Sequence, residues 1–266
     1  MPAAVDFEAR RFQTAAAHYL SGRPPYPAAL IERTVELVGL GPDDRVLDLG
    51  CGPAQLAIAF APHVGQALAM DPEPVMLALA RRAAREVPNV EVVEGRSDGL
   101  GPELGRFRAA VIGRAFHWMD REDTLRRFET LLEPGGAVAL FGDDLPELPE
   151  NAWAKDYQAL LDRYSADDEY RESLRSPAYT PHTSVLLGSA FSRLERITII
   201  APYRMTLDTL IDRALSLSAT SRARLGDRAD ELIAELTARA SEWSSTGVFT
   251  EILASSALIA RRPAEV

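Results

Sequence analysis

The segment of residues 46–55, VLDLGCGPAQ, constrains the fold of this chain more than any other feature. Val46, Leu47 and Leu49 are apolar and strand-prone, and the sequence becomes helical in character from Ala54 onward. The two glycines between these parts permit backbone angles and a close ligand approach that a side chain would block. A strand therefore runs into the N-terminus of a helix, whose free backbone N–H groups suit a phosphate or a carboxylate.

The glycine pattern of this turn is D-x-G-x-G-x-A, because Asp48 precedes Gly50 and Gly52. A dinucleotide site needs G-x-G-x-x-G, and Gln55 stands where the last glycine would be. The acidic residue on the strand would repel a pyrophosphate and would attract the amino group of a methionine moiety. The turn resembles motif I of class I S-adenosylmethionine (SAM) dependent methyltransferases, with Ala54 in place of the common third glycine. The alternative is a tight strand-to-helix turn without a ligand.

Composition limits the classes of protein that the chain can belong to. Its 266 residues can bury a full core, and the absence of a Pro/Gly/Ser-rich linker predicts a single domain. The formal net charge of −10 disfavours nucleic-acid partners, whose phosphates would be repelled. A lone cysteine, Cys51, fits a reducing compartment. With no signal-peptide core and no run of ~20 apolar residues, we expect a cytoplasmic protein without a membrane partner.

The middle of the chain has the pattern of an α/β fold. From residue 43 to 142, short apolar strands alternate with helical stretches, as in a parallel sheet covered on both faces. The predicted strands are residues 45–49, 66–70, 90–93, 109–113 and 137–141. The predicted helices lie near residues 54–61, 74–86 and 121–132. Pro134, Gly135 and Gly136 predict a turn before the fifth strand, and an EPGG turn also occurs in the family named above.

The pattern changes after Gly142. Residues 152–164 and 207–217 are predicted amphipathic helices, and residues 197–200 and 249–260 are predicted strands. Residues 231–239 carry mixed charges and predict a solvated helix face.

The resemblance implies how these parts are organised. In the family, two further strands complete a Rossmann-like, doubly wound sheet of seven strands, mostly parallel with the last antiparallel, and insertions near them build a helical lid. The expected parts of this single domain are an N-terminal cap segment (1–40), a SAM-binding core (41–145) and the last strands (146–266), with lid insertions near 150–192 and 203–246.

Asp71 forms the second half of the cofactor pattern. It ends the second predicted strand, 19 residues after Gly52, where a carboxylate can accept hydrogen bonds from both hydroxyls of a ribose. An Asp before a proline is otherwise a turn or helix cap. Pro72 and Met76 are placed to pack on the adenine.

The segment after the third strand, EGRSDGL at residues 94–100, is a second candidate for the adenine. In the resembling family this place contacts the ring through a backbone amide and a polar side chain. Ser97 and Asp98 are the candidates, with Asp98 preferred, and a plain turn is the alternative.

The fourth strand ends in GRAFHWMD at residues 113–120, and ligands gather at the carboxyl ends of strands in open α/β sheets. Arg114 and Ala115 are expected to line the methionine portion of the cofactor. His117 is the candidate catalytic base, because its unperturbed pKa suits proton removal near neutrality. Trp118 offers a flat face to a positively charged sulfonium. The alternatives are a core position for Trp118 and a merely satisfied buried hydrogen bond for His117.

Before motif I, residues 18–27 read HYLSGRPPYP, a stiff proline-rich segment. Segments of the form Y-x-x-x-R-P-x-Y-P precede motif I in many small-molecule SAM methyltransferases, so Tyr19, Arg23 and Tyr26 resemble a feature that covers the methionine end. Arg23 is a candidate partner for the carboxylate of the methionine. Tyr26 either contacts the substrate or anchors the segment as an aromatic side chain.

Adjacent carboxylates at Asp143 and Asp144 invite a metal interpretation, which we reject. Neighbouring side chains of an extended chain point in opposite directions, and no His or Cys stands at ligand spacing. Asp143 is kept as a candidate substrate contact. Tyr157, His182 and Tyr203 fall in the expected lid and are expected to be core or surface residues rather than catalytic ones.

These motifs predict a small-molecule SAM methyltransferase of the type 11/25 domain group, similar to trans-aconitate methyltransferase-like enzymes. The acceptor atom would be O, N or C, S-adenosylhomocysteine would be the product, no metal would be needed, and a role in natural-product biosynthesis is expected. No N/D-P-P-Y/F tetrapeptide of base methylation follows the fourth strand. The alternatives are a SAM-binding regulatory or partner protein and, against the evidence of Gln55, a nicotinamide-dependent oxidoreductase.

Overall fold

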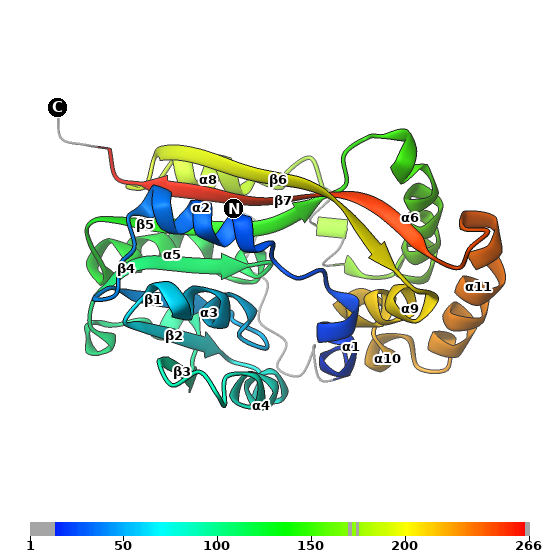
Figure 1. Ribbon diagram of the computed structural model, residues 1–266, viewed down its shortest axis with the longest axis horizontal. Coiled ribbons are helices and arrows are strands. Elements are labelled where there is room, and N and C mark those ends of the chain that lie inside the picture. The colour runs from blue at the N-terminus through cyan, green and yellow to red at the C-terminus, as the bar shows by residue number, and fades with distance from the viewer. Residues whose placement is uncertain (1–13, 170–171, 174–175, 264–266) are drawn as a thin grey trace.

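The computed structural model describes residues 14–169, 172–173 and 176–263. Parts of the predicted cap segment (1–13), of the lid insertion (170–171 and 174–175) and of the C-terminus (264–266) lie outside the described residues. One sheet of seven strands runs through the described part, in the order β3-β2-β1-β4-β5-β7-β6 (Figure 1). Its strands are β1 (Arg45–Leu49), β2 (Gln66–Asp71), β3 (Val90–Glu94), β4 (Phe107–Gly113), β5 (Leu132–Asp144), β6 (Arg193–Met205) and β7 (Phe249–Arg261).

The predicted α/β class is confirmed. β1 to β5 pair in parallel, and β7 pairs antiparallel to both β5 and β6. The helices of the first half are α1 (Ala16–Gly22), α2 (Ala28–Val38), α3 (Gln55–Phe60), α4 (Pro74–Ala83) and α5 (Arg121–Leu131). Those of the second half are α6 (Ala152–Tyr164), α8 (His182–Leu187), α9 (Leu207–Ser216), α10 (Arg222–Leu225) and α11 (Arg228–Trp243).

Two apolar clusters cover the two faces of the sheet. Successive residues of a strand point to opposite faces, so Val46 belongs to the cluster with α2 and α3, and Leu47 to the cluster with α5 and α8. Leu186 of α8 is fully buried in the second cluster. Although α8 falls within the predicted lid insertion, it therefore packs on the sheet.

A third apolar cluster holds the lid together. It joins α6, α9 and α11 through side chains such as Leu160, Leu210 and Leu232, with Phe249 of β7. Figure 1 places these helices beyond the end of the sheet to which the arrows of β4 and β5 point. The predicted helices at 152–164 and 207–217 are confirmed as α6 and α9.

The strands that carry the lid are longer than the sequence predicts. β7 pairs with β5 only from Ala254 to Arg261, whereas its pairing with β6 continues out to Phe249 opposite Met205. The outer halves of β6 and β7 thus form a two-stranded ribbon that reaches from the sheet into the lid cluster.

The predicted turn at Pro134–Gly136 takes a different form. The strand assignment of β5 runs through these residues, but its register against β4 jumps from Phe107 opposite Leu132 to Ala109 opposite Ala137. Gly135 has a φ of 73°, in the left-handed region that glycine tolerates. The break is therefore a bulge inside β5.

Candidate active site

A cavity of about 550 Å³ lies where the carboxyl ends of the strands face the lid. It brings together most of the residues singled out in the sequence. Those that line it are Tyr19, Arg23, Gly50, Gly52, Asp71, Pro72, Met76, Ser97, Arg114, Ala115, His117, Trp118 and Asp143.

Asp48, Cys51 and Asp98 do not line the cavity. Asp48 is buried, and its Oδ2 accepts a hydrogen bond of 2.9 Å from the backbone N–H of Ala57, so it ties β1 to the first turn of α3. Cys51 is buried in the turn itself. Asp98 is exposed and pairs with Arg96 at 3.3 Å, while its neighbour in sequence, Ser97, faces the cavity. An amino-group contact by Asp48 and an adenine contact by Asp98 therefore have no geometric support here.

The glycine turn has the backbone that its sequence predicts. Gly50, Gly52 and Ala54 all have positive φ, with values of 70°, 53° and 62°. A Cβ on Gly50 would lie 2.7 Å from the Cβ of Ala115, so the β1 and β4 loops pack too closely for a side chain. A Cβ on Gly52 would meet no described atom within 4 Å. Gly52 therefore leaves its backbone open to a ligand in the cavity.

Asp71 joins the end of β2 to the glycine turn. Its Oδ2 accepts a hydrogen bond from the N–H of Gly52 at 2.9 Å, and its Oδ1 accepts one from the N–H of Glu73 at 2.8 Å. Burial raises the pKa of the Asp71 carboxyl, and these two N–H groups oppose the shift. Asp71 thus caps the following turn and also lines the cavity, where each oxygen keeps a second lone pair for a ligand.

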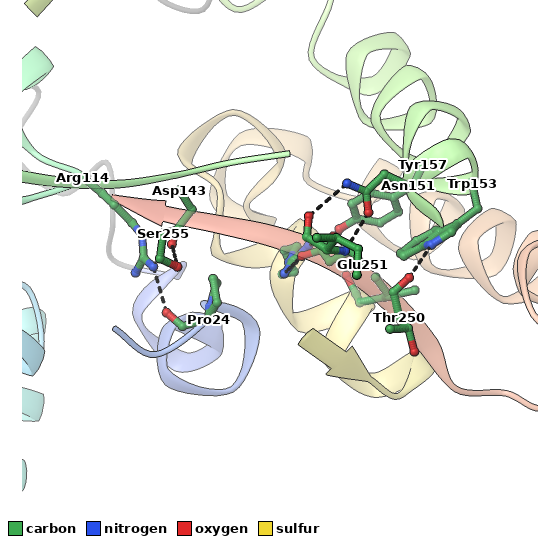
Figure 2. A network of polar contacts seen from close by, with 12 residues as sticks. Pro24, Arg114, Asp143, Asn151, Trp153, Tyr157, Thr250, Glu251 and Ser255 are labelled. Atoms are coloured by element: carbon green, nitrogen blue, oxygen red, sulfur yellow. Dashed lines mark hydrogen bonds and ion pairs between the residues drawn. The ribbon is translucent and has the colours of Figure 1, made fainter. Parts of the chain in front are cut away.

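Arg114 stands at the centre of a polar cluster where β4 and β5 end (Figure 2). Its Nε donates to Oδ2 of Asp143 at 2.8 Å, and its Nη2 donates to the carbonyl of Pro24, also at 2.8 Å. Ser255 donates to the other oxygen of Asp143 at 2.7 Å. The guanidinium lies 4.5 Å from the ring centre of Tyr26, which does not line the cavity. Tyr26 is thus an anchor of the N-terminal segment.

Two guanidinium nitrogens of the cavity wall lack a hydrogen-bond partner. Nε of Arg23 and Nη1 of Arg114 are buried and unpaired among the described residues, although Nη2 of Arg23 donates to the carbonyl of Ser216. Burial lowers the pKa of the Arg23 guanidinium. Tyr19 partly opposes this shift, and the positive charges of Arg114 and Arg213 add to it. An unmade buried hydrogen bond is costly, so these nitrogens suit an anionic group of a ligand.

His117 lies in the short 3₁₀ turn Phe116–Trp118, at the cavity wall. Its ring centre is 5.0 Å from that of Trp118. Burial, together with smaller contributions from His182, Arg23 and Arg121, lowers the pKa of His117 to about 3. The imidazole is therefore neutral at neutral pH.

A buried ion pair in the lid wall escaped the sequence analysis. Nη1 and Nη2 of Arg213 donate to the two carboxylate oxygens of Glu251 at 2.9 and 2.7 Å, and Glu251 is 0% exposed. Both residues line the cavity beside Tyr157. The usable signal was the alternation of β7, since Glu251 stands between the buried residues Phe249 and Leu253 on the inward face of the strand.

Within the described residues, no group of three His, Cys, Asp or Glu side chains is placed to hold a metal ion. Likewise, none of the helices in the described ranges is long and apolar enough to cross a membrane.

Comparison with known proteins relates this chain to methyltransferases. Residues 46–136 match the family model described as a methyltransferase domain. A methyltransferase of Mycobacterium tuberculosis is 25% identical over 229 residues, covering 84% of this chain and 85% of the relative. A 2-phytyl-1,4-naphtoquinone methyltransferase of Synechococcus elongatus is 32% identical over 130 residues, covering 46% of this chain and 55% of the relative.

Among solved structures, a SAM-dependent methyltransferase from Geobacter sulfurreducens, crystallised with S-adenosylhomocysteine, matches with a TM-score of 0.54 at 16% identity. The match covers 96% of this chain and 99% of that one. At this identity the likeness shows the fold alone, which is that of the Rossmann-like methyltransferases. With the sequence matches, residues 46–136 form a methyltransferase domain, and the chain is similar to SAM-dependent methyltransferases over most of its length.

Proposed function

We propose that the protein transfers the methyl group of SAM to an oxygen, nitrogen or carbon atom of a small organic acceptor, as in natural-product biosynthesis. The observation that carries this proposal is the shared cavity. It joins the glycine turn and Asp71 at one end to Arg213 and Glu251 of the lid at the other, with His117 on its wall.

Residues at the cofactor end suit the two halves of SAM. Asp71 would accept the ribose hydroxyls, and Pro72, Met76 and Ser97, which also line the cavity, would contact the adenine. At the methionine end, the unpaired nitrogens of Arg23 and Arg114 would bind the carboxylate, with the other cavity-lining candidates Tyr19, Gly50 and Ala115 around it. A carboxylate there would satisfy both donors, which is why the residues present fit this cofactor.

When bound, SAM supplies the electrophilic methyl group. The chain holds the acceptor in line with that methyl, and such alignment is the largest contribution expected from the protein. His117 would accept the proton that the acceptor atom loses, while an electron pair of that atom forms the new bond to the methyl carbon, the bond from that carbon to sulfur breaks and S-adenosylhomocysteine leaves. A base with a pKa of about 3 is sufficient, because the acceptor proton becomes strongly acidic as the bond forms. Trp118 offers its ring face to the sulfonium charge.

A small acceptor fits the lid end best. Apolar residues of the cavity wall include Leu161 and Leu217 from the lid, Leu145 after β5 and Leu253 of β7. The similarity to a naphtoquinone methyltransferase over part of the chain supports a small organic acceptor. The net charge of −10 argues against a nucleic-acid acceptor, and the single buried cysteine, Cys51, fits a reducing compartment such as the cytoplasm.

The test compares His117→Ala with His63→Ala, a control in the 3₁₀ turn Ala61–His63 that lies outside the cavity. Turnover is followed as S-adenosylhomocysteine release over a panel of phenols, quinols, amines and carboxylic acids. We expect His117→Ala to lower turnover about 100-fold, within the usual range for general bases, and to change S-adenosylhomocysteine affinity by less than about threefold.

Other outcomes would change the proposal. Unchanged turnover in His117→Ala would eliminate the role as base. Tight binding of SAM with no methylated product across the panel would favour a regulatory or partner protein. Preference for NAD over SAM in calorimetry would overturn the cofactor assignment.

A further inference from the structure

Next to the His117 ring lies a cluster of three side chains that have no role in the proposed methyl transfer. Arg121 begins α5, His182 begins α8, and Tyr179 stands three residues before His182. The ring of His182 lies 6.4 Å from that of His117, and the two planes are inclined by only 11°. A second imidazole is therefore stacked on the candidate base.

Hydrogen bonds define the protonation of this second imidazole. Nη1 of Arg121 lies 3.1 Å from Nδ1 of His182, and a guanidinium can only donate. Nδ1 of His182 is therefore the acceptor, which assigns its proton to Nε2. Arg121 is itself held in place, since Nη1 also donates to the carbonyl of Thr180 at 2.7 Å and its guanidinium lies 4.8 Å from the ring centre of Tyr179.

The His182 ring packs against the side of the sheet that α5 and α8 cover. His182 contacts Phe116 edge-on, with ring centres 5.1 Å apart, and Leu186 of the same helix is fully buried against the sheet. His182 is thus anchored to the sheet face rather than to the lid cluster. Its position is independent of how the lid meets an acceptor.

We propose that His182, fixed as its Nε2–H tautomer by Arg121, is a positioning residue that holds the His117 ring at the cavity wall as a proton acceptor. This inference rests on the proposed function of His117. Among the described residues, the charged and titratable groups that act on the pKa of His117 come from three elements, namely Arg23 at the end of α1, Arg121 of α5 and His182 of α8. The carboxylate of Asp120, three residues after His117, accepts from the N–H of Asp123 and caps α5.

The first test needs no acceptor. The full chain, labelled with ¹⁵N-histidine and saturated with S-adenosylhomocysteine, is titrated by NMR, with the four imidazoles assigned by single substitutions. We expect the unprotonated Nδ1 signal for His182 and its loss in Arg121→Met. In His182→Ala the titration midpoint of His117 should rise by about one pH unit toward its ordinary value. His63→Gln serves as the control and should leave both signals in place.

The second test measures catalysis. His182→Ala should lower kcat about tenfold and leave the affinity for S-adenosylhomocysteine within about twofold, with the acid limb of the pH profile moved to higher pH. His182→Phe keeps a flat ring without nitrogen and should retain more kcat than His182→Ala. Thermal unfolding of each variant shows that it is folded.

The two tests distinguish a failure of this inference from a failure of the proposed base role of His117. An Nδ1–H tautomer for His182, or an unmoved His117 midpoint in His182→Ala, overturns this inference alone. Unchanged turnover in His117→Ala overturns the proposed base and this inference with it.

Discussion

The two ends of the cavity hold their buried carboxylates in different ways. At the cofactor end, Asp48 and Asp71 accept hydrogen bonds from backbone N–H groups of the glycine turn, of α3 and of the turn after β2. Between the candidate methionine site and the lid, Asp143 pairs with the guanidinium group of Arg114, and at the lid end Glu251 pairs with that of Arg213. Figure 2 shows Asp143 of β5 beside Ser255 of β7, and Glu251 farther along β7, the strand that connects the sheet to the lid.

The difference lies in how far apart the partners are in sequence. The backbone partners at the cofactor end are 2, 9 and 19 residues away, so local chain geometry is enough to form the contacts. The ion pairs span 29 and 38 residues and join separate elements, α9 with β7 in the case of Arg213. The cofactor end is therefore specified by a short motif, whereas the lid end exists only once distant elements have packed.

The largest expected effect is at the lid end. Glu251→Ala leaves the Arg213 guanidinium, whose side chain is only 13% exposed, without its partner. Because an uncompensated buried charge is costly, we expect a loss of about 3–5 kcal/mol in the free energy of unfolding. Urea unfolding of the purified chain measures this loss.

The matched control is the exposed pair of Arg222 and Asp230, whose side chains are 45% and 75% exposed. Asp230→Ala should leave stability almost unchanged, since exposed pairs contribute little. Equal losses for Glu251→Ala and Asp230→Ala would mean that the lid pair is not a buried ion pair in solution.

The next largest effect is on ligand affinity at the cofactor end. Asp71→Ala removes the carboxylate expected to bind the ribose, and we expect S-adenosylhomocysteine affinity to fall about 30- to 150-fold, about 2–3 kcal/mol. Isothermal titration calorimetry measures this affinity. Asp98→Ala, at an exposed carboxylate outside the cavity, should change the affinity less than about threefold. A larger loss for Asp98 than for Asp71 would restore Asp98 as the adenine contact and remove the ribose role from Asp71.

The same contrast explains what the sequence could and could not predict. β1 matches its predicted range and β2 extends one residue beyond its own, because buried parallel strands are short apolar runs bounded by turns. β3, an edge strand whose valines are half-buried, also extends one residue beyond its predicted range. β6 runs over Arg193–Met205 although only residues 197–200 were predicted, since most of its residues are exposed or half-buried at the sheet edge and give no apolar run.

Site residues follow the same division. The left-handed glycine turn and the position of Asp71 come from local sequence and were predicted. The pairing of Arg213 with Glu251 and the stack of His182 on His117 depend on the docking of α9 and α8, which local sequence does not encode. His182 was expected to be a core or surface residue for that reason.

The smallest expected effect is a gain in stability on changing Asp48, whereas Glu251→Ala is expected to lower stability. Burial raises the pKa of Asp48 to about 7, with Asp71 adding to the shift and the N–H of Ala57 opposing it. A folded-state pKa above the unfolded value means that the stability from protonated Asp48 is fully present below about pH 4 and is lost as the pH rises through about 7. The ionised carboxylate therefore costs stability at alkaline pH.

Asp48→Asn keeps an oxygen for the N–H of Ala57 and removes the charge. Relative to the wild-type chain, the variant should gain about 2 kcal/mol in the free energy of unfolding between pH 5 and pH 8, measured in urea without ligand. Glu251→Gln makes the same chemical change at the lid end and should destabilise at both pH values, because Arg213 then lacks a countercharge. If Asp48→Asn shows no pH dependence, Asp48 titrates normally, and the two ends do not differ in what a buried carboxylate costs.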